Sequence, residues 1–147
     1  MPTRTARTAW NGSLEDGSGQ VELSSSHVGT YDVSFPKRAA DDADGTTSPE
    51  ELVAAAHSAC YAMSLSNLAT EAGGTVQSLD VSAAVTLGPD KEAGGFKLTG
   101  ITLTVRGEVD GLDDAAFKEA ADKAKAGCPI SKALAAVDIT LDAALES

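Results

Sequence analysis

The sequence is poor in basic residues, in aromatic residues and in cysteine. The 11 Lys and Arg face 22 Asp and Glu, which leaves a formal net charge of -11. This balance argues against nucleic acid and anionic membranes as partners, because both bind clustered positive charge. Aromatic residues make up only 4%, so Ala, Val and Leu must fill the core. The two cysteines, Cys60 and Cys128, are too few for a disulfide-rich secreted scaffold.

Long apolar runs are also missing. No stretch approaches the roughly 18 apolar residues of a membrane helix, and the N-terminal residues lack the apolar run of a secretory signal. We therefore expect a cytoplasmic protein, in which thiols stay reduced unless they carry out redox chemistry or bind metal. A chain of 147 residues has room for one domain with a core, so we expect a single domain over residues 1–147.

The order of strand and helix signals predicts an α+β fold with antiparallel sheets. Hairpin-like spacing dominates, and a change of apolar phase at Gly100 predicts a β-bulge. A short helix is expected to begin at Pro129. The expected strands are 8–11, 20–24, 31–35, 79–87, 96–105 and 137–141, and a helix is expected over 114–126.

The clearest local signal is the start of a long helix. Ser48 suits the N-cap, Pro49 the first helical position and Glu51 the third, which together predict a capping box. The helix is expected to end before Gly73. Its many alanines predict a helix buried on most sides, with Cys60 on a face shared by residues spaced at helical intervals: Val53, Ala56, Met63 and Asn67.

The two cysteines differ in their local surroundings. Cys128 lies between Gly127 and Pro129, beside an expected helix N-terminus where exposed N–H groups and the helix dipole favour a thiolate. Cys60 lies inside an alanine-rich helix, where it is equally compatible with a small buried hydrophobic residue. By this argument alone Cys128 is the better nucleophile, and Cys60 needs another source of positive charge.

Arg38 is the candidate for that charge. It is one of few arginines and stands between a strand and an acidic loop, where Glu50 could hold its guanidinium by two hydrogen bonds. The alternative is a solvated arginine paired with Asp41 or Asp42.

Metal binding is the less favoured interpretation of the same residues. Cys60, Cys128, His57 and His27 lack the close C-x2-4-C spacing typical of a zinc site. His57 is more simply interpreted as a helix-surface or packing residue. The acidic segment 40–51 nearly matches a calcium-binding loop but lacks its first Asp ligand. We expect no metal and no bound cofactor.

Two long motifs resemble a known family. Residues 47–63 read TSPEELVAAAHSACYAM, and residues 124–131 read AKAGCPIS. With the opening residues 9–12 and the closing residues 139–142, they strongly resemble the OsmC (osmotically inducible protein C) family of thiol peroxidases, over essentially the whole chain.

The resemblance implies a peroxidase that reduces organic hydroperoxides in oxidative or osmotic stress defence. It implies that Cys60 is the peroxidatic cysteine, that Cys128 resolves it as a disulfide, and that Glu50 and Arg38 complete the site. The sister branch, the organic hydroperoxide resistance proteins, carries its arginine near position 18, where this chain has Ser18, so the resemblance is to the OsmC branch. The family also implies an intertwined homodimer with interfacial sites and an external dithiol reductant, with lipoylated protein favoured over thioredoxin or a small thiol.

The spacing of Glu50 and Cys60 leads to the same dimer. Ten residues of helix correspond to about 15 Å along the axis, so the two cannot share a site within one helix. We expect Glu50 of one subunit to serve the other subunit's site, with Phe35, Met63 and Tyr61 binding the substrate's apolar part. The competing hypotheses are a redox-sensing or binding protein without efficient turnover, a thiol hydrolase on the same fold, and a purely structural stress protein.

Overall fold

The structure is a computed structural model that describes residues 1–146. The chain forms two compact units, one of residues 1–52 and one that begins at Val53. Among the described helices, none is both long and apolar enough to cross a membrane. That residues 1–147 act as one domain stays a prediction.

The first unit is built on a three-stranded antiparallel sheet in the order β1 (Arg7–Asn11), β2 (Ser18–Glu22) and β3 (Thr30–Val33). The register pairs Trp10 with Gly19, and Gly19 with Val33. Because side chains alternate along a strand, one face carries Trp10, Val21 and Val33, and the other is polar.

A short helix, α1 (Phe35–Arg38), follows β3. The prediction that the strand continues to Phe35 is therefore wrong. The Ser34 side chain accepts a hydrogen bond from the backbone N–H of Lys37, and Pro36 lies in the first turn, where its fixed φ suits a helix. These local contacts turn the chain at Ser34 and place Arg38 at the helix end.

The long helix α2 (Pro49–Glu71) begins and ends close to its predicted limits. The Ser48 hydroxyl accepts a hydrogen bond from the backbone N–H of Glu51 at 3.1 Å, which confirms Ser48 as the cap. The reciprocal half of the capping box differs, because the Glu51 carboxylate accepts from the Thr47 hydroxyl at 2.8 Å. Gly73, with φ of 95°, follows the helix.

The second unit contains a three-stranded sheet in the order β4 (Thr75–Pro89), β5 (Phe96–Asp110) and β6 (Ile139–Glu146). β4 and β5 form an antiparallel hairpin, but β6 pairs parallel to β5. The expectation of purely antiparallel sheets is therefore wrong for this strand. Two helices, α3 (Asp114–Gly127) and α4 (Pro129–Ala133), form the crossover that a parallel pair requires.

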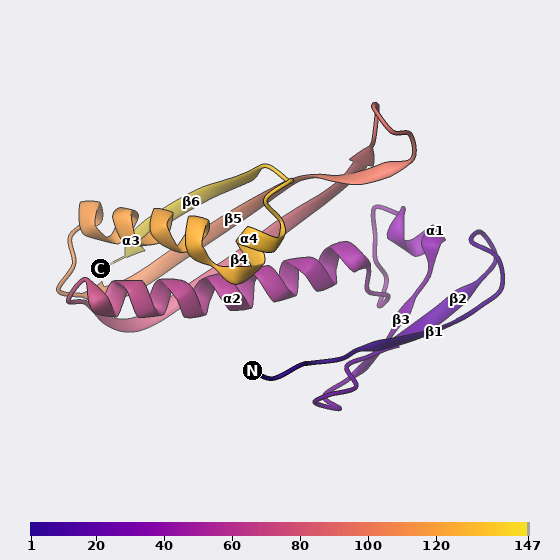
Figure 1. The fold of residues 1–147 in the computed structure, drawn as a ribbon, viewed down its shortest axis with the longest axis horizontal. Helices are drawn as coiled ribbons and strands as arrows, with labels where there is room; N and C mark the ends of the chain where they lie inside the picture. The colour runs from indigo at the N-terminus through magenta and orange to yellow at the C-terminus, as the bar shows by residue number, and fades with distance from the viewer. Residues whose placement is uncertain (147) are drawn as a thin grey trace. The chain divides into compact units, whose positions relative to one another are not determined.

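Alternation along β5 places its apolar residues against the helices. Leu103, Val105 and Val109 pack with residues of α2 and α3, including Phe117, and both helices lie alongside the sheet in Figure 1. The ladder shifts where Thr86 pairs with Gly100 but Leu87 pairs with Leu98. This irregularity confirms the predicted bulge at Gly100.

The burial of α2 differs from the sequence-based expectation. The fully buried residues form a single stripe at intervals of four: His57, Tyr61, Leu65 and Ala69. Met63 is 74% exposed, and Ala55, Ala56, Ala59 and Asn67 are exposed as well. In the single chain, α2 is therefore covered along one side rather than on most sides.

Candidate thiol redox site

The two cysteines lie side by side in the second unit. Cys60 comes from the middle of α2, and Cys128 is the N-cap residue of α4. Their Sγ atoms are 2.9 Å apart and both thiols are free. A disulfide bond is about 2.05 Å long, so a small movement would allow the pair to be oxidised. Cys128 is fully buried and Cys60 is partly exposed.

The surroundings shift the pKa values of the two thiols in opposite directions. Burial, together with the hydrogen bond shared with Cys128, raises the pKa of Cys60. Burial alone would also raise the pKa of Cys128, but Cys60 and the backbone N–H groups of Ser131 and Ile130 hold it below its ordinary value. These N–H groups act by proximity, since neither completes a hydrogen bond to the Cys128 side chain. In the single chain, Cys128 is therefore the more acidic thiol, as its position at a helix start predicts.

A buried histidine lies next to this pair. His57 Nε2 is 2.7 Å from the Ser131 hydroxyl, and both residues are shielded from solvent. Burial lowers the pKa of His57, which favours the neutral ring. The interpretation of His57 as a packing residue agrees with its position, but its hydrogen bond to Ser131 was not foreseen. A sequence signal for it exists, because His57 precedes Cys60 by three residues and Ser131 follows Cys128 by three.

In the first unit, Arg38 and Glu50 form the predicted ion pair. The Arg38 Nε donates to both carboxylate oxygens of Glu50 at 3.1 Å, and Nη2 donates to Oε1 at 2.6 Å. Burial would raise the pKa of Glu50, but Arg38 lowers it below its ordinary value through hydrogen bonds and charge. The same pairing raises the pKa of Arg38. The carboxylate thus fixes the direction of a permanently charged guanidinium.

The neighbouring basic residue, Lys37, is engaged elsewhere. Its Nζ is 2.8 Å from an Asp44 carboxylate oxygen, in a pair whose two side chains are exposed. The alternative pairing of Arg38 with Asp41 or Asp42 is not seen. Arg38 is therefore the oriented cation of this segment and Lys37 is part of the solvated surface.

An apolar cavity of about 280 Å³ adjoins Arg38 in the first unit. Phe35, Trp10 and Leu14 contribute to its lining together with residues of β2, β3 and the start of α2. Of the three residues expected to bind substrate, Phe35 lies at this cavity. Tyr61 does not fit that role, because it is fully buried in the second unit and its hydroxyl donates to the Ala121 carbonyl oxygen at 3.0 Å.

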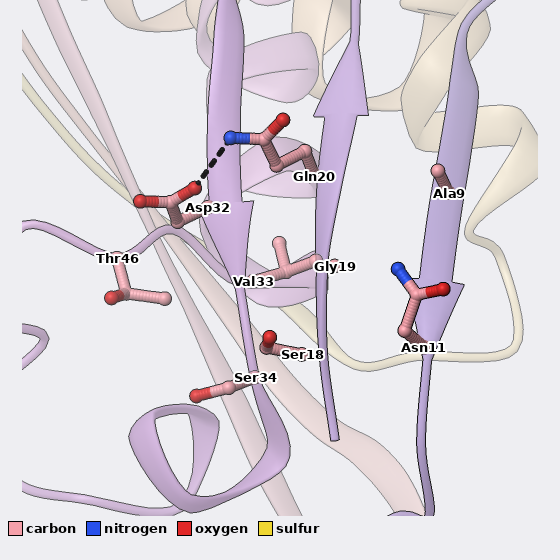
Figure 2. A pocket seen from close by; sticks show the side chains of 9 residues that line it. All are labelled: Ala9, Asn11, Ser18, Gly19, Gln20, Asp32, Val33, Ser34 and Thr46. Carbon is pink, nitrogen blue, oxygen red and sulfur yellow. Dashed lines mark hydrogen bonds between the residues drawn. The ribbon is translucent and has the colours of Figure 1, made fainter.

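A second, polar cavity of about 480 Å³ borders β1, β2 and β3 (Figure 2). Figure 2 shows the Gln20 amide directed at Asp32, to whose carboxylate it donates a hydrogen bond of 3.0 Å. The remaining lining consists of small or neutral side chains such as Asn11, Ser18 and Thr46. This cavity contributes no thiol and no cation to the redox chemistry.

Comparisons with known proteins agree with the fold. Residues 41–142 match the family described as OsmC-like protein. The chain is 41% identical over 138 residues to the protein named Peroxiredoxin OsmC of Escherichia coli, covering 94% of this chain and 93% of that one. Among solved structures, the organic hydroperoxide resistance protein OhrB of Bacillus subtilis matches with a TM-score of 0.74 and 31% identity, over 95% of this chain and 98% of that one.

A third match is the organic hydroperoxide resistance protein from Elizabethkingia anophelis, with a TM-score of 0.79 and 26% identity, over 99% of this chain and 98% of that one. The α+β fold and the adjacent free thiols define a protein of the OsmC and organic hydroperoxide resistance class. The chain belongs to the OsmC-like family.

Proposed function

We propose that this protein is a cysteine-based peroxidase that reduces organic hydroperoxides to alcohols. The observation that carries the proposal is the pair of free thiols whose sulfur atoms are 2.9 Å apart. The relatives described above are named as a peroxiredoxin and as organic hydroperoxide resistance proteins. Adjacent thiols suit this chemistry because a two-electron oxidation of the pair ends in a disulfide that a reductant can reverse.

Cys60 attacks first in the proposed sequence. Its thiolate attacks the distal oxygen of the hydroperoxide, the O–O bond breaks, and the alkoxide takes a proton to leave as alcohol. Cys60 is then a sulfenic acid. The Cys128 sulfur attacks the Cys60 sulfur, hydroxide leaves as water after protonation, and a Cys60–Cys128 disulfide remains. An external dithiol returns both sulfurs to thiols and is itself oxidised.

The first step needs a positive charge at Cys60, because burial and Cys128 raise the pKa of Cys60 in the single chain. Arg38, held by Glu50, is the proposed source. Glu50 and Cys60 are ten residues apart on α2, or about 15 Å along its axis. We infer that Arg38 and Glu50 of a second copy serve Cys60, in an intertwined homodimer with two interfacial sites.

The exposed side of α2 supports such a dimer. Small residues allow helices to approach closely, and the exposed residues of this face include Ala55, Ala56 and Ala59. Met63, 74% exposed, lies on the same helix and would be covered by the second copy. In this proposal Met63 contributes to the substrate surface of the dimer.

The proposed substrates are alkyl or lipid hydroperoxides rather than hydrogen peroxide. The apolar cavity beside Arg38, with Phe35 in its lining, offers space for an alkyl or aryl group. Burial of apolar surface contributes about 25 cal/mol per Å², a gain that hydrogen peroxide cannot make. The proposed reductant is a dithiol such as that of a lipoylated protein, and the proposed compartment is the cytoplasm.

A steady-state assay tests this function. Purified protein is mixed with cumene hydroperoxide or hydrogen peroxide and a dithiol, and peroxide loss is followed over many turnovers. We expect catalytic consumption of cumene hydroperoxide at a higher kcat/KM than of hydrogen peroxide. One oxidation without turnover would instead favour a redox sensor or carrier. Turnover of an activated ester without any reductant would favour a thiol hydrolase.

A further inference from the structure

A second contact lies beside the thiol pair and joins the same two segments of the chain. His57 precedes Cys60 by three residues on α2, and Ser131 of α4 follows Cys128 by three residues. The His57 Nε2 and Ser131 Oγ atoms are 2.7 Å apart, and the two Sγ atoms are 2.9 Å apart. Residues three apart on a helix are neighbours on its surface, so the two contacts are separated by about one helical turn.

The hydrogen bond between His57 and Ser131 is shielded from water within one chain. His57 is fully buried and Ser131 is 5% exposed, and both belong to the unit that begins at Val53. A second copy of the chain would add to this cover and remove none of it, so the contact does not depend on the proposed dimer. Breaking it would leave polar groups unpaired away from water, which is unfavourable. The contact therefore opposes separation of the two segments.

The surroundings of His57 determine which of its ring nitrogens carries the proton. Nδ1 is buried and, within residues 1–146, has no hydrogen-bond partner. A proton on Nδ1 would make a buried N–H group without an acceptor, which is rare in proteins. The proton is therefore assigned to Nε2, which donates to the Ser131 oxygen. A residue that replaces His57 without loss of the contact must supply a donor in the same place.

The segment that carries Cys128 depends on contacts of this kind. α4 has five residues, of which Ser131 is buried, and so short a helix is not stable by itself. Within residues 1–146, the side-chain hydrogen bonds that join α2 to residues 128–134 are the contact between the two sulfurs and the contact between His57 and Ser131. One contact alone would let the segment rotate about the sulfur atoms. Two contacts fix its distance from α2 and its orientation.

We propose that His57 and Ser131 are positioning residues for the resolving step, and that their hydrogen bond holds Cys128 where it reacts with the Cys60 sulfenic acid before a second hydroperoxide does. This inference rests on the proposed peroxidase cycle. Neither His57 nor Ser131 exchanges electrons or protons with the substrate in this proposal. Their contact holds the segment that carries Cys128 against α2.

Two reactions compete for the sulfenic acid. In the resolving step, the Cys128 sulfur attacks the Cys60 sulfur, the S–O bond breaks, and hydroxide leaves as water after protonation. In the competing step, a second hydroperoxide transfers its distal oxygen to the Cys60 sulfur and leaves as alcohol, and a sulfinic acid remains. A dithiol does not reduce a sulfinic acid. A segment held in place therefore keeps the protein in its catalytic cycle.

Positioning has a consequence that a purely structural hydrogen bond lacks. The equilibrium between the folded dithiol and the folded disulfide depends on the effective concentration of one sulfur at the other. A purely structural bond stabilises both folded forms equally and leaves this equilibrium unchanged. The proposed contact matters more to the dithiol, because in the disulfide the covalent bond itself joins the two segments.

Equilibration in mixtures of reduced and oxidised glutathione measures this effective concentration without any hydroperoxide. Each protein disulfide that forms converts one oxidised glutathione into two reduced ones. We expect His57→Leu and Ser131→Ala each to lower the effective concentration about threefold to tenfold, the range for one ordinary hydrogen bond. The double variant should lower it no further, because both single variants already lack the same contact. His57→Gln, whose amide also donates, should restore most of it.

Tyr61→Phe is the matched control. It removes another buried hydrogen bond of α2, to the Ala121 carbonyl oxygen, that does not involve α4. We expect it to lower the free energy of unfolding in urea and to leave the effective concentration unchanged. If His57→Leu and Ser131→Ala behave like this control, the pair has a structural role only and the inference is wrong. Ser131→Ala, the smaller change, decides this by itself if His57→Leu does not fold.

A second measurement follows the competition for the sulfenic acid. The reduced protein is treated with excess cumene hydroperoxide, and peptide mass spectrometry gives the ratio of Cys60 sulfinic acid to Cys60–Cys128 disulfide. We expect this ratio to rise about threefold to tenfold in Ser131→Ala, and an unchanged ratio would overturn the inference. A protein that consumes no hydroperoxide would disprove the proposed function, and the glutathione equilibrium would then decide by itself whether His57 and Ser131 position Cys128.

Discussion

The Glu50 carboxylate accepts hydrogen bonds of 2.6 to 3.1 Å from two nitrogen atoms of the Arg38 guanidinium, Nε and Nη2. This geometry fixes the direction of a charge on a surface that otherwise carries a large excess of negative groups. An arginine held in this way needs little rearrangement when a negative charge forms nearby. In the proposed dimer, that charge lies first on the Cys60 thiolate and then on the alkoxide oxygen that leaves the hydroperoxide.

Replacing Glu50 by Gln should impair catalysis more than folding. The amide keeps the shape of the side chain but loses the charge that orients Arg38. We expect kcat/KM for cumene hydroperoxide to fall about 10- to 100-fold, the range for a lost charge-assisted hydrogen bond. Asp44→Asn removes the exposed pair with Lys37 and is the control. An equal loss in both variants would show that the Arg38–Glu50 pair has no special role.

Arg38 and Lys37 should respond very differently to the same substitution. Met keeps much of the apolar stem and removes the charge. We expect Arg38→Met to reduce kcat/KM at least as much as Glu50→Gln, and Lys37→Met to change it by less than about twofold, because exposed ion pairs contribute little. Steady-state kinetics of both variants show which of the two residues is the cation of the site. The reverse ranking would make Lys37 the cation of the site.

The two cysteines should differ in single-turnover experiments. We expect Cys60→Ser to abolish peroxide consumption. Cys128→Ser should react with one equivalent of hydroperoxide, stop at a sulfenic acid that a dimedone-type reagent traps, and cycle poorly with a dithiol. Activity retained in Cys60→Ser and lost in Cys128→Ser would assign attack to Cys128, the more acidic thiol of the single chain.

Substrate preference should depend on Phe35. The Ala variant removes apolar surface from the cavity beside Arg38. We expect KM for cumene hydroperoxide to rise about tenfold, within the range for a lost apolar contact, with little effect on hydrogen peroxide. Phe96→Ala is the control, because Phe96 is exposed at the start of β5, outside this cavity. Equal effects on the two peroxides would exclude the cavity as the site of the alkyl group.

Stability should fall on mild acidification because of His57. Burial holds its pKa below the ordinary value of about 6.5. As the pH falls, the unfolded chain therefore binds a proton at His57 before the folded chain does. The contribution of the neutral ring to the free energy of unfolding is complete above about pH 6.5 and is lost as the pH falls toward the folded-state pKa. The free energy of unfolding, measured with urea at about pH 7.5 and about pH 5.5, should fall less between the two pH values in His57→Gln than in the unchanged protein. Exposed His27 is common to both, and parallel losses would contradict the prediction.

Local signals were enough to predict α2, because Ser48 and Pro49 act on their own neighbours in the chain. The direction of β6 was not predictable in this way. Whether the last strand pairs parallel or antiparallel depends on the crossover through α3 and α4, and the apolar alternation around Ile139 is the same in both cases.

Charge chemistry allowed the Arg38–Glu50 pair to be predicted, since an oriented guanidinium needs a carboxylate nearby. The buried face of α2 was predicted incorrectly. Alanines occur on several faces of this helix, so the sequence pattern does not distinguish the stripe that contains Tyr61 from the face that contains Met63. Packing against α3 and β5 determines which of the two is buried. His57 and Ser131 are 74 residues apart, and their contact depends on that same packing.

The most direct test of the central claim is peptide mass spectrometry after one equivalent of cumene hydroperoxide is added to the reduced protein. The proposed mechanism predicts a peptide pair joined by a Cys60–Cys128 disulfide, formed at the rate of peroxide loss, and a sulfenic acid on Cys60 when Cys128 is replaced by Ser. Oxidation of Cys128 with Cys60 left as a free thiol would contradict it, as would peroxide loss without any disulfide.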